Sequence, residues 1–189
     1  PVRVETLTFG GADYGLRVSG EVRPENRTLT VDGEARLAAD DLSRFAALAG
    51  RDLTGQAEIA VAGSADLLGG IFDLRLDVAG SGLAIGEETV DRLLDGPVAL
   101  SADARRDTSG VVLRAFSLDS PAITASGEGR LGGGDSDLEV TARLADVGVI
   151  APDHTGPLSL TGTVAEPRPD VYDVALQLDG PYGLTGTVA

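Results

Sequence analysis

The sequence is dominated by short segments in which apolar and polar residues alternate with a period of two. In residues 71–80, IFDLRLDVAG, aliphatic or aromatic residues alternate with charged ones. Such alternation predicts a β-strand with one apolar and one polar face. Similar segments recur about every 10–14 residues and are separated by Gly, Pro, Asp or Ser. This spacing predicts a mainly β fold, which could be a meander, sandwich, barrel or solenoid.

The apolar positions of these segments form the candidate functional surface. The residues assigned to it are Phe72, Leu74, Leu76, Val78, Val98, Leu100, Leu138, Val140, Leu144, Leu158, Leu160, Val164, Tyr172, Val174, Leu176, Leu178, Leu184 and Val188. The surface could be an ordinary closed core. It could also be an open apolar trough, because aromatic residues make up only 4% of the chain. A large exposed apolar surface requires a ligand or a partner.

Two segments depart from the period of two. Residues 40–50, DDLSRFAALAG, and 87–96, EETVDRLLDG, place apolar residues three, four or seven apart and end at glycine. Both patterns predict short amphipathic helices, the first with an aspartate at its N-terminus. Each helix is followed by strand-like segments, so the chain contains a weak internal repeat. The approximate units are 32–80, 81–131 and 132–189.

The charge balance argues against nucleic-acid binding. The net charge is −15, and acidic residues are spread along the whole chain. Such a domain repels nucleic acid and anionic membrane surfaces. The chain contains neither Met nor Cys, begins with Pro1, and carries the hexapeptide LTGTVA at 160–165 and again at 184–189. We therefore expect residues 1–189 to be a fragment of a longer, repetitive protein.

No motif in the sequence predicts catalysis, a cofactor or a metal. The string GEGRLG at 127–132 fits a dinucleotide-binding pattern, but strand-like rather than helical sequence follows it. Asp135 and Asp137 lack the further ligands of a calcium loop. His154 is the single histidine and lies in a loop bracketed by Pro and Gly, without a G-x-S-x-G element in the chain. We expect a protein that is not an enzyme and has no cofactor.

Three stretches together resemble the repeat region of the TamB family of translocation and assembly module proteins. They are DDLSRFAALAGRDLTGQAEIAVAGSA at 40–65, ETVDRLLDGPVALSADARRDTSGVVLRAFSLDSPAITASGEGRL at 88–131, and LSLTGTVAEPRPD at 158–170. The Arg-only, Ala- and Gly-rich composition is similar to that of α-proteobacterial members. The family has no catalytic motif that can be carried over to this sequence.

The resemblance implies an elongated, curled antiparallel β-sheet with an open groove, a β-taco, and two short amphipathic helices. It also implies a periplasmic segment of an inner-membrane-anchored protein in a Gram-negative bacterium. AsmA-like proteins of this kind are expected to conduct phospholipid acyl chains toward the outer membrane. The intact protein could also contact the BamA-like partner TamA during autotransporter and outer-membrane assembly. Two alternatives remain, a scaffold that pairs β-strands during outer-membrane protein assembly and a secreted sandwich or solenoid module.

Overall fold

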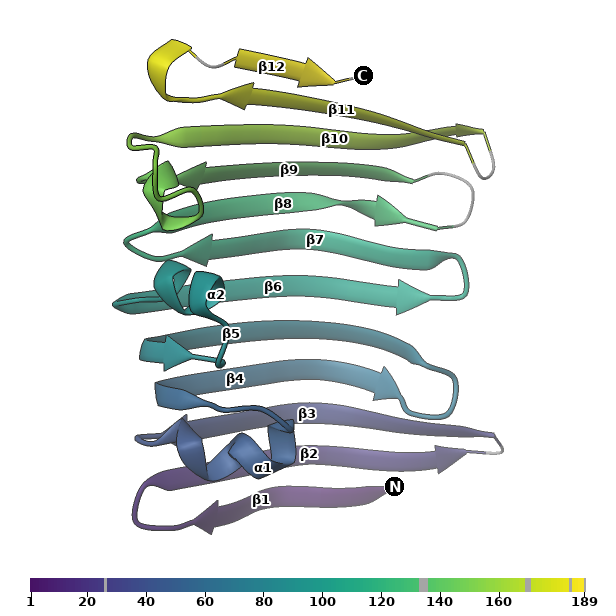
Figure 1. Cartoon of the computed structure of the whole chain (residues 1–189). Helices are drawn as coiled ribbons and strands as arrows, with labels where there is room; N and C mark the ends of the chain where they lie inside the picture. Colours follow the sequence, from purple (N-terminus) through teal and green to yellow (C-terminus); the bar gives the residue numbers. More distant parts are fainter. Residues whose placement is uncertain (26, 133–135, 169–170, 184, 189) are drawn as a thin grey trace.

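The chain folds into one antiparallel sheet of twelve strands (Figure 1). The computed structural model describes residues 1–25, 27–132, 136–168, 171–183 and 185–188. The strands are β1 (Val2–Gly10), β2 (Tyr14–Glu25), β3 (Thr28–Ala39), β4 (Thr54–Asp66), β5 (Ile71–Ala84), β6 (Pro97–Asp107), β7 (Gly110–Asp119), β8 (Ile123–Leu131), β9 (Asp137–Leu144), β10 (Leu158–Arg168), β11 (Val171–Asp179) and β12 (Thr185–Val188). Each strand pairs with its neighbours in the sequence, so the order in the sheet is the order in the chain. The predicted mainly β, curled antiparallel sheet is confirmed, and it does not close on itself.

Helical turns occur in the connections at one end of the strands. They are the 3-10 helix η1 (Leu42–Phe45), α1 (Ala46–Ala49), α2 (Glu88–Leu93), η2 (Val147–Val149) and η3 (Pro181–Gly183). The predicted helices at 40–50 and 87–96 correspond to η1 with α1 and to α2. Among the helices that the structure describes, none is long and apolar enough to cross a membrane.

Three of these connections begin with the same kind of N-terminal cap. An acidic side chain accepts a hydrogen bond from a backbone N–H in the first turn: Asp41 from Ser43 at 2.9 Å, Glu87 from Val90 at 2.8 Å, and Asp146 from Gly148 at 2.9 Å. Such caps satisfy N–H groups that have no partner within the helix. Each of the expected units 32–80, 81–131 and 132–189 contains one such connection.

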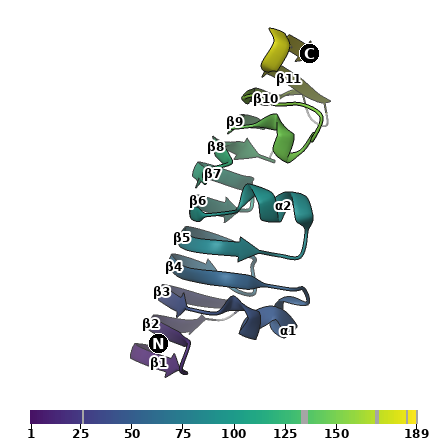
Figure 2. The same cartoon turned by 60° about the vertical axis from the view of Figure 1, so that its left-hand side comes forward.

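The small buried core lies beneath these connections. α1 and α2 lie on the same side of the sheet, as does the β9–β10 connection that contains η2 (Figure 2). The buried apolar side chains of the described residues are Ala39, Ala57, Val98, Leu144 and Val147. Tyr14 in β2 packs edge-to-face against Phe45 of η1, with ring centroids 5.7 Å apart. The helices therefore cover one end of a sheet face and leave the remainder of that face without a second layer.

A line of glycines and β-bulges crosses the strands. Gly20, Gly33 and Gly63 are direct neighbours in β2, β3 and β4. A Cβ on Gly63, whose φ is +137°, would lie 2.0 Å from the carbonyl oxygen of Asp73. Register shifts occur at a similar level of the strands in the β1–β2, β6–β7 and β7–β8 pairings. Bulges and glycines let strands bend and twist, which accounts for the curl.

Candidate functional site

Cross-strand pairing brings the apolar positions of successive strands onto one face, called the apolar face below. Directly paired residues of neighbouring strands point to the same side of a sheet. The first row of the apolar face consists of Phe9, Leu16, Leu37, Ile59, Val78, Leu100, Leu118, Ala125, Ala142, Leu160 and Leu178. It runs from β1 to β11 with a paired neighbour at every step.

Two further rows run beside the first. The second consists of Leu7, Val18, Ala35, Val61, Leu76, Ala102, Phe116, Gly127, Val140, Gly162 and Leu176. The third consists of Val4, Gly20, Gly33, Gly63, Leu74, Ala104, Leu113, Gly129, Leu138, Val164 and Val174. The apolar face is therefore continuous across the strands as well as along them.

The structure places the predicted surface residues in three groups. Most of them lie in the three rows, and Phe72 and Tyr172 lie on the same face nearer the opposite strand ends. Val98 and Leu144, at 6% and 9% exposure, are buried in the core under the helical connections, and Leu158 pairs with Leu144. Leu184 lies outside the described residues. The backbone of Val188 pairs with Leu176, and its side chain is also outside the description.

The apolar face is only half covered. Most of its side chains in the central strands are partly exposed, and side chains near the edges are more so, with Phe9 at 51% and Tyr172 at 55%. A contiguous apolar surface on this scale marks an interaction site in a soluble protein.

The opposite face, called the polar face, carries charged side chains. Arg114 of β7 reaches across two strands, and its Nε donates a hydrogen bond of 2.6 Å to Asp103 while its terminal nitrogens bind Asp73. This guanidinium holds the pKa of Asp73 below its usual value, and the carboxylates of Asp73 and Asp103 raise the pKa of Arg114. The polar face is thus organised for contact with water.

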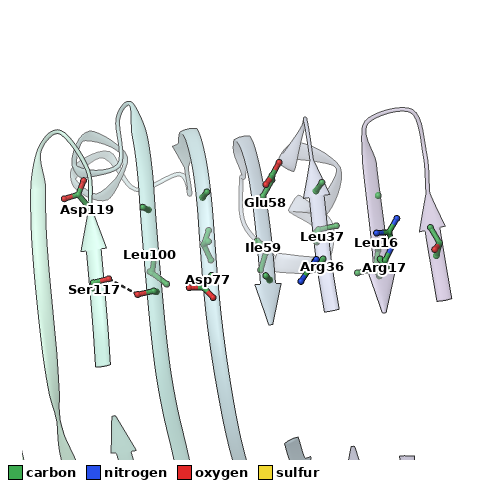
Figure 3. Close-up of a pocket in the computed structure, with 18 residues that line it drawn as sticks. Leu16, Arg17, Arg36, Leu37, Glu58, Ile59, Asp77, Leu100, Ser117 and Asp119 are labelled. Atoms are coloured by element: carbon green, nitrogen blue, oxygen red, sulfur yellow. Dashed lines mark hydrogen bonds between the residues drawn. The ribbon is translucent and has the colours of Figure 1, made fainter. Parts of the chain in front are cut away.

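A shallow hollow of about 680 Å³ lies on the polar face across β1 to β7 (Figure 3). Small residues of neighbouring strands line it, namely Gly15, Ala38, Ala60, Ala79 and Ala99. Residues of the first row also contribute to its lining, namely Leu16, Leu37, Ile59, Val78 and Leu100. Charged side chains surround it, including Arg17, Arg36 and Asp77. Ser101 and Ser117 share a hydrogen bond of 2.8 Å in the hollow. The sequence patterns did not predict this hollow, because it arises from small residues on the polar side of several strands.

The remaining sequence motifs lie in strands and connections of the sheet. Residues 127–131 of GEGRLG belong to β8, and the next element that the structure describes is the strand β9. His154 lies in the β9–β10 connection, where its backbone N–H donates to Ala151. Asp137 begins β9, and Asp135 is outside the described residues. Within the described ranges, no group of three or more His, Asp or Glu side chains is placed to hold a metal ion.

One residue on the apolar face was missed by the sequence patterns. Arg106 in β6 pairs directly with Phe72 of β5 and with Val111 of β7, so its side chain belongs to the apolar face. Every other arginine with a described side chain in a strand lies on the polar face. Continuing the alternation from Val98 through Ala104 would have identified this position.

The fold and this face define a class of protein: an open, single-layer antiparallel β-meander with one apolar and one charged face. Comparison of the chain with known protein families, with curated proteins and with solved structures finds no match. The resemblance to the TamB family stays a prediction.

Proposed function

We propose that the apolar face binds phospholipid acyl chains and that the chain is a segment of a TamB-type periplasmic bridge between the inner and outer membranes. The observation that carries this proposal is the continuity of three apolar rows across the sheet, with a second layer at one end only. The proposed activity is binding and passage of lipid rather than catalysis.

The chemistry of the apolar face suits a flexible hydrocarbon chain. Its rows consist mainly of Leu, Val, Ile, Ala and Gly, and they offer no specific polar group to an incoming ligand. Burial of one methylene group contributes about 0.8 kcal/mol. An acyl chain that contacts protein on one side and remains partly exposed gains a fraction of this value at each carbon. Binding at many similar positions, each weak, allows a lipid to enter and to move on.

The polar face supports a role in an aqueous compartment. Its carboxylates and guanidinium groups keep it hydrated, and the net charge of −15 disfavours adsorption of this face to anionic lipid surfaces. A sheet with such opposite faces can bind hydrocarbon on its apolar face while its polar face stays in contact with water. We also propose that the intact bridge contacts TamA, as the resemblance implies.

Site-specific photo-crosslinking tests the proposed function. A photoreactive residue is placed at Leu74 or Leu176 on the apolar face, and matched controls carry it at Arg75 or Gln177, the next residue in each strand. The chain is produced in the periplasm of a Gram-negative bacterium, and adducts are identified by mass spectrometry. We expect lipid adducts at Leu74 and Leu176 and none at the controls.

The same experiment can reject the proposal. Equal labelling at both faces would show nonspecific contact, and the absence of lipid adducts at both apolar positions would exclude acyl-chain binding. Adducts to nascent outer-membrane proteins instead of lipid would favour the strand-pairing scaffold.

A further inference from the structure

A furrow runs along β6 on the apolar face. Its floor is formed by Ala102 and Ala104, which pair with the larger Leu76 and Leu74 of β5 on one side. On the other side, Ala102 pairs with Phe116 and Ala104 with Leu113 of β7. Both alanines are partly exposed. Because these small side chains stand between two lines of larger ones, we infer a shallow depression parallel to the strand, named the β6 furrow here.

The dimensions of the β6 furrow fit one acyl chain. Its walls stand on strands two positions apart, which corresponds to about 9–10 Å between their backbones. From Arg106 to Ala102 the strand advances four residues, or about 13 Å. The hydrocarbon of one bilayer leaflet is about 15 Å thick, half of the apolar core. The furrow therefore has nearly the length of an acyl chain within one leaflet, and it ends at Leu100, where the large side chains of the first row begin.

Arg106 lies at the open end of the β6 furrow. It is exposed, and its paired neighbours are Phe72 and Val111, so no acidic side chain lies directly opposite it. Among the contacts of the described residues, its guanidinium has neither a hydrogen bond nor an ion pair. The nearest acid in sequence, Asp107, binds Arg105 on the polar face and accepts a hydrogen bond of 2.8 Å from the N–H of Ser109. Arg106 is thus an uncompensated cation beside an apolar channel.

We propose that Arg106 and the β6 furrow together bind one phospholipid, with the lipid phosphate on the guanidinium and an acyl chain along Ala104 and Ala102. This inference rests on the proposed function and names its headgroup site. Guanidinium and phosphate form strong, charge-assisted hydrogen bonds. The remainder of this acidic chain repels anions, so an anionic preference at this site requires a local cation.

The test uses three probes with the purified chain, below their critical micelle concentrations: dodecyl phosphate, dodecyl maltoside and inorganic phosphate. Binding is measured by calorimetry and by native mass spectrometry. We expect dodecyl phosphate to bind about tenfold more tightly than dodecyl maltoside, and inorganic phosphate not to displace it. Without a contribution from Arg106, the net charge of the chain predicts the opposite order of the two amphiphiles.

Four variants separate the contributions of charge and channel. Arg106→Gln should abolish the preference for dodecyl phosphate and leave dodecyl maltoside unaffected, whereas Arg105→Gln on the polar face should leave both unaffected. Ala104→Phe should fill the furrow and weaken both amphiphiles at least tenfold, whereas Ala99→Phe on the polar face should not. Circular dichroism of each variant establishes that the sheet is retained.

Different failures have different meanings. If Arg106→Gln binds dodecyl phosphate as the parent does while Ala104→Phe loses both probes, the headgroup site is wrong and acyl-chain binding stands. If neither amphiphile binds the parent chain, the proposed function fails as well. If Ala104→Phe instead converts a dimer into a monomer without changing amphiphile binding, a second copy occupies the furrow and the headgroup proposal is overturned.

Discussion

Gly33 of β3 lies directly opposite Gly20 of β2, and a Cβ on Gly33 would lie 2.8 Å from the Cα of Gly20 and 2.3 Å from the carbonyl oxygen of Ser19. The two strands approach so closely here that a side chain at either position would force the backbone apart. We expect Gly33→Ala to lower the free energy of unfolding by about 1–3 kcal/mol. Chemical denaturation with a far-UV probe measures this change.

Gly15 of the neighbouring strand provides the matched control. An added Cβ at Gly15 would meet nothing within 4 Å, so Gly15→Ala should be neutral or slightly stabilising. Equal unfolding midpoints for the two variants would show that the contact between Gly20 and Gly33 does not constrain the sheet.

Ser120 connects α2 to the β7–β8 turn. Its buried hydroxyl donates to the carbonyl of Leu93 at 2.7 Å and accepts from the N–H of Ile123 at 3.1 Å. We expect Ser120→Ala to cost about 1–3 kcal/mol, because both backbone groups lose this partner. Hydrogen exchange should show the loss of protection concentrated in α2, while the exposed Ser117→Ala control changes little. Uniform loss across the sheet would contradict this local role.

Asp66 makes the stability of the β4–β5 turn depend on pH. Its carboxylate accepts hydrogen bonds from the N–H groups of Leu29 and Leu68, and the bond from Leu29 is the largest cause of its lowered pKa. A lowered folded-state pKa stabilises the fold above the unfolded value of about 3.8. This contribution is lost as the pH falls further, through the folded-state value.

Asp66→Asn should therefore be less stable than the parent chain at pH 7, and the difference should shrink as the pH falls below about 4. Thermal unfolding from pH 7 to 3 measures the difference, with the exposed Glu58→Gln as the control. A difference that is constant over this range would show that the charge of Asp66 contributes nothing.

Val140 tests the apolar face at a site away from the β6 furrow. It lies in the second row and is partly exposed, and Thr141 beside it is exposed on the polar face. We expect Val140→Asp to reduce capture of a fluorescent phospholipid about tenfold, because a carboxylate must lose water beneath the acyl chain. Thr141→Asp adds the same charge on the polar face and should retain capture. Equal capture by both variants would argue against lipid contact at this row.

Where the alternation of apolar and polar residues is regular, the sequence alone predicts which face of the sheet each side chain occupies. In residues 71–80 of β5, in β9 and in residues 173–179 of β11, the period of two assigns each residue to a face, because the pairing with the neighbouring strand is regular there. In β7 a bulge lies between Leu113 and Phe116, so two residues of the apolar face stand three apart and no clean alternation is visible. A bulge depends on pairing with the neighbouring strand, which a single segment does not encode.

Other structural features also could not be predicted from a single segment of sequence, because they depend on contacts with a second segment. η2 has three residues, too few for a helical period, and only its place beside the other helical connections identifies it. The close approach of Gly20 and Gly33 and the hydrogen bonds of Ser120 each require the position of a second segment. The facing of Arg106 could be predicted from the alternation in β6, but a charged side chain does not match a pattern defined by apolar positions.

The order of the strands also determines how this sheet would come apart. Because every strand pairs only with its neighbours in the chain, no long-range strand pairing locks one end of the sheet to the other. Tension applied between the chain ends would break the hydrogen bonds of an outer strand one after another. The sheet would then peel one hairpin at a time, and the strands still paired would keep their apolar rows in register.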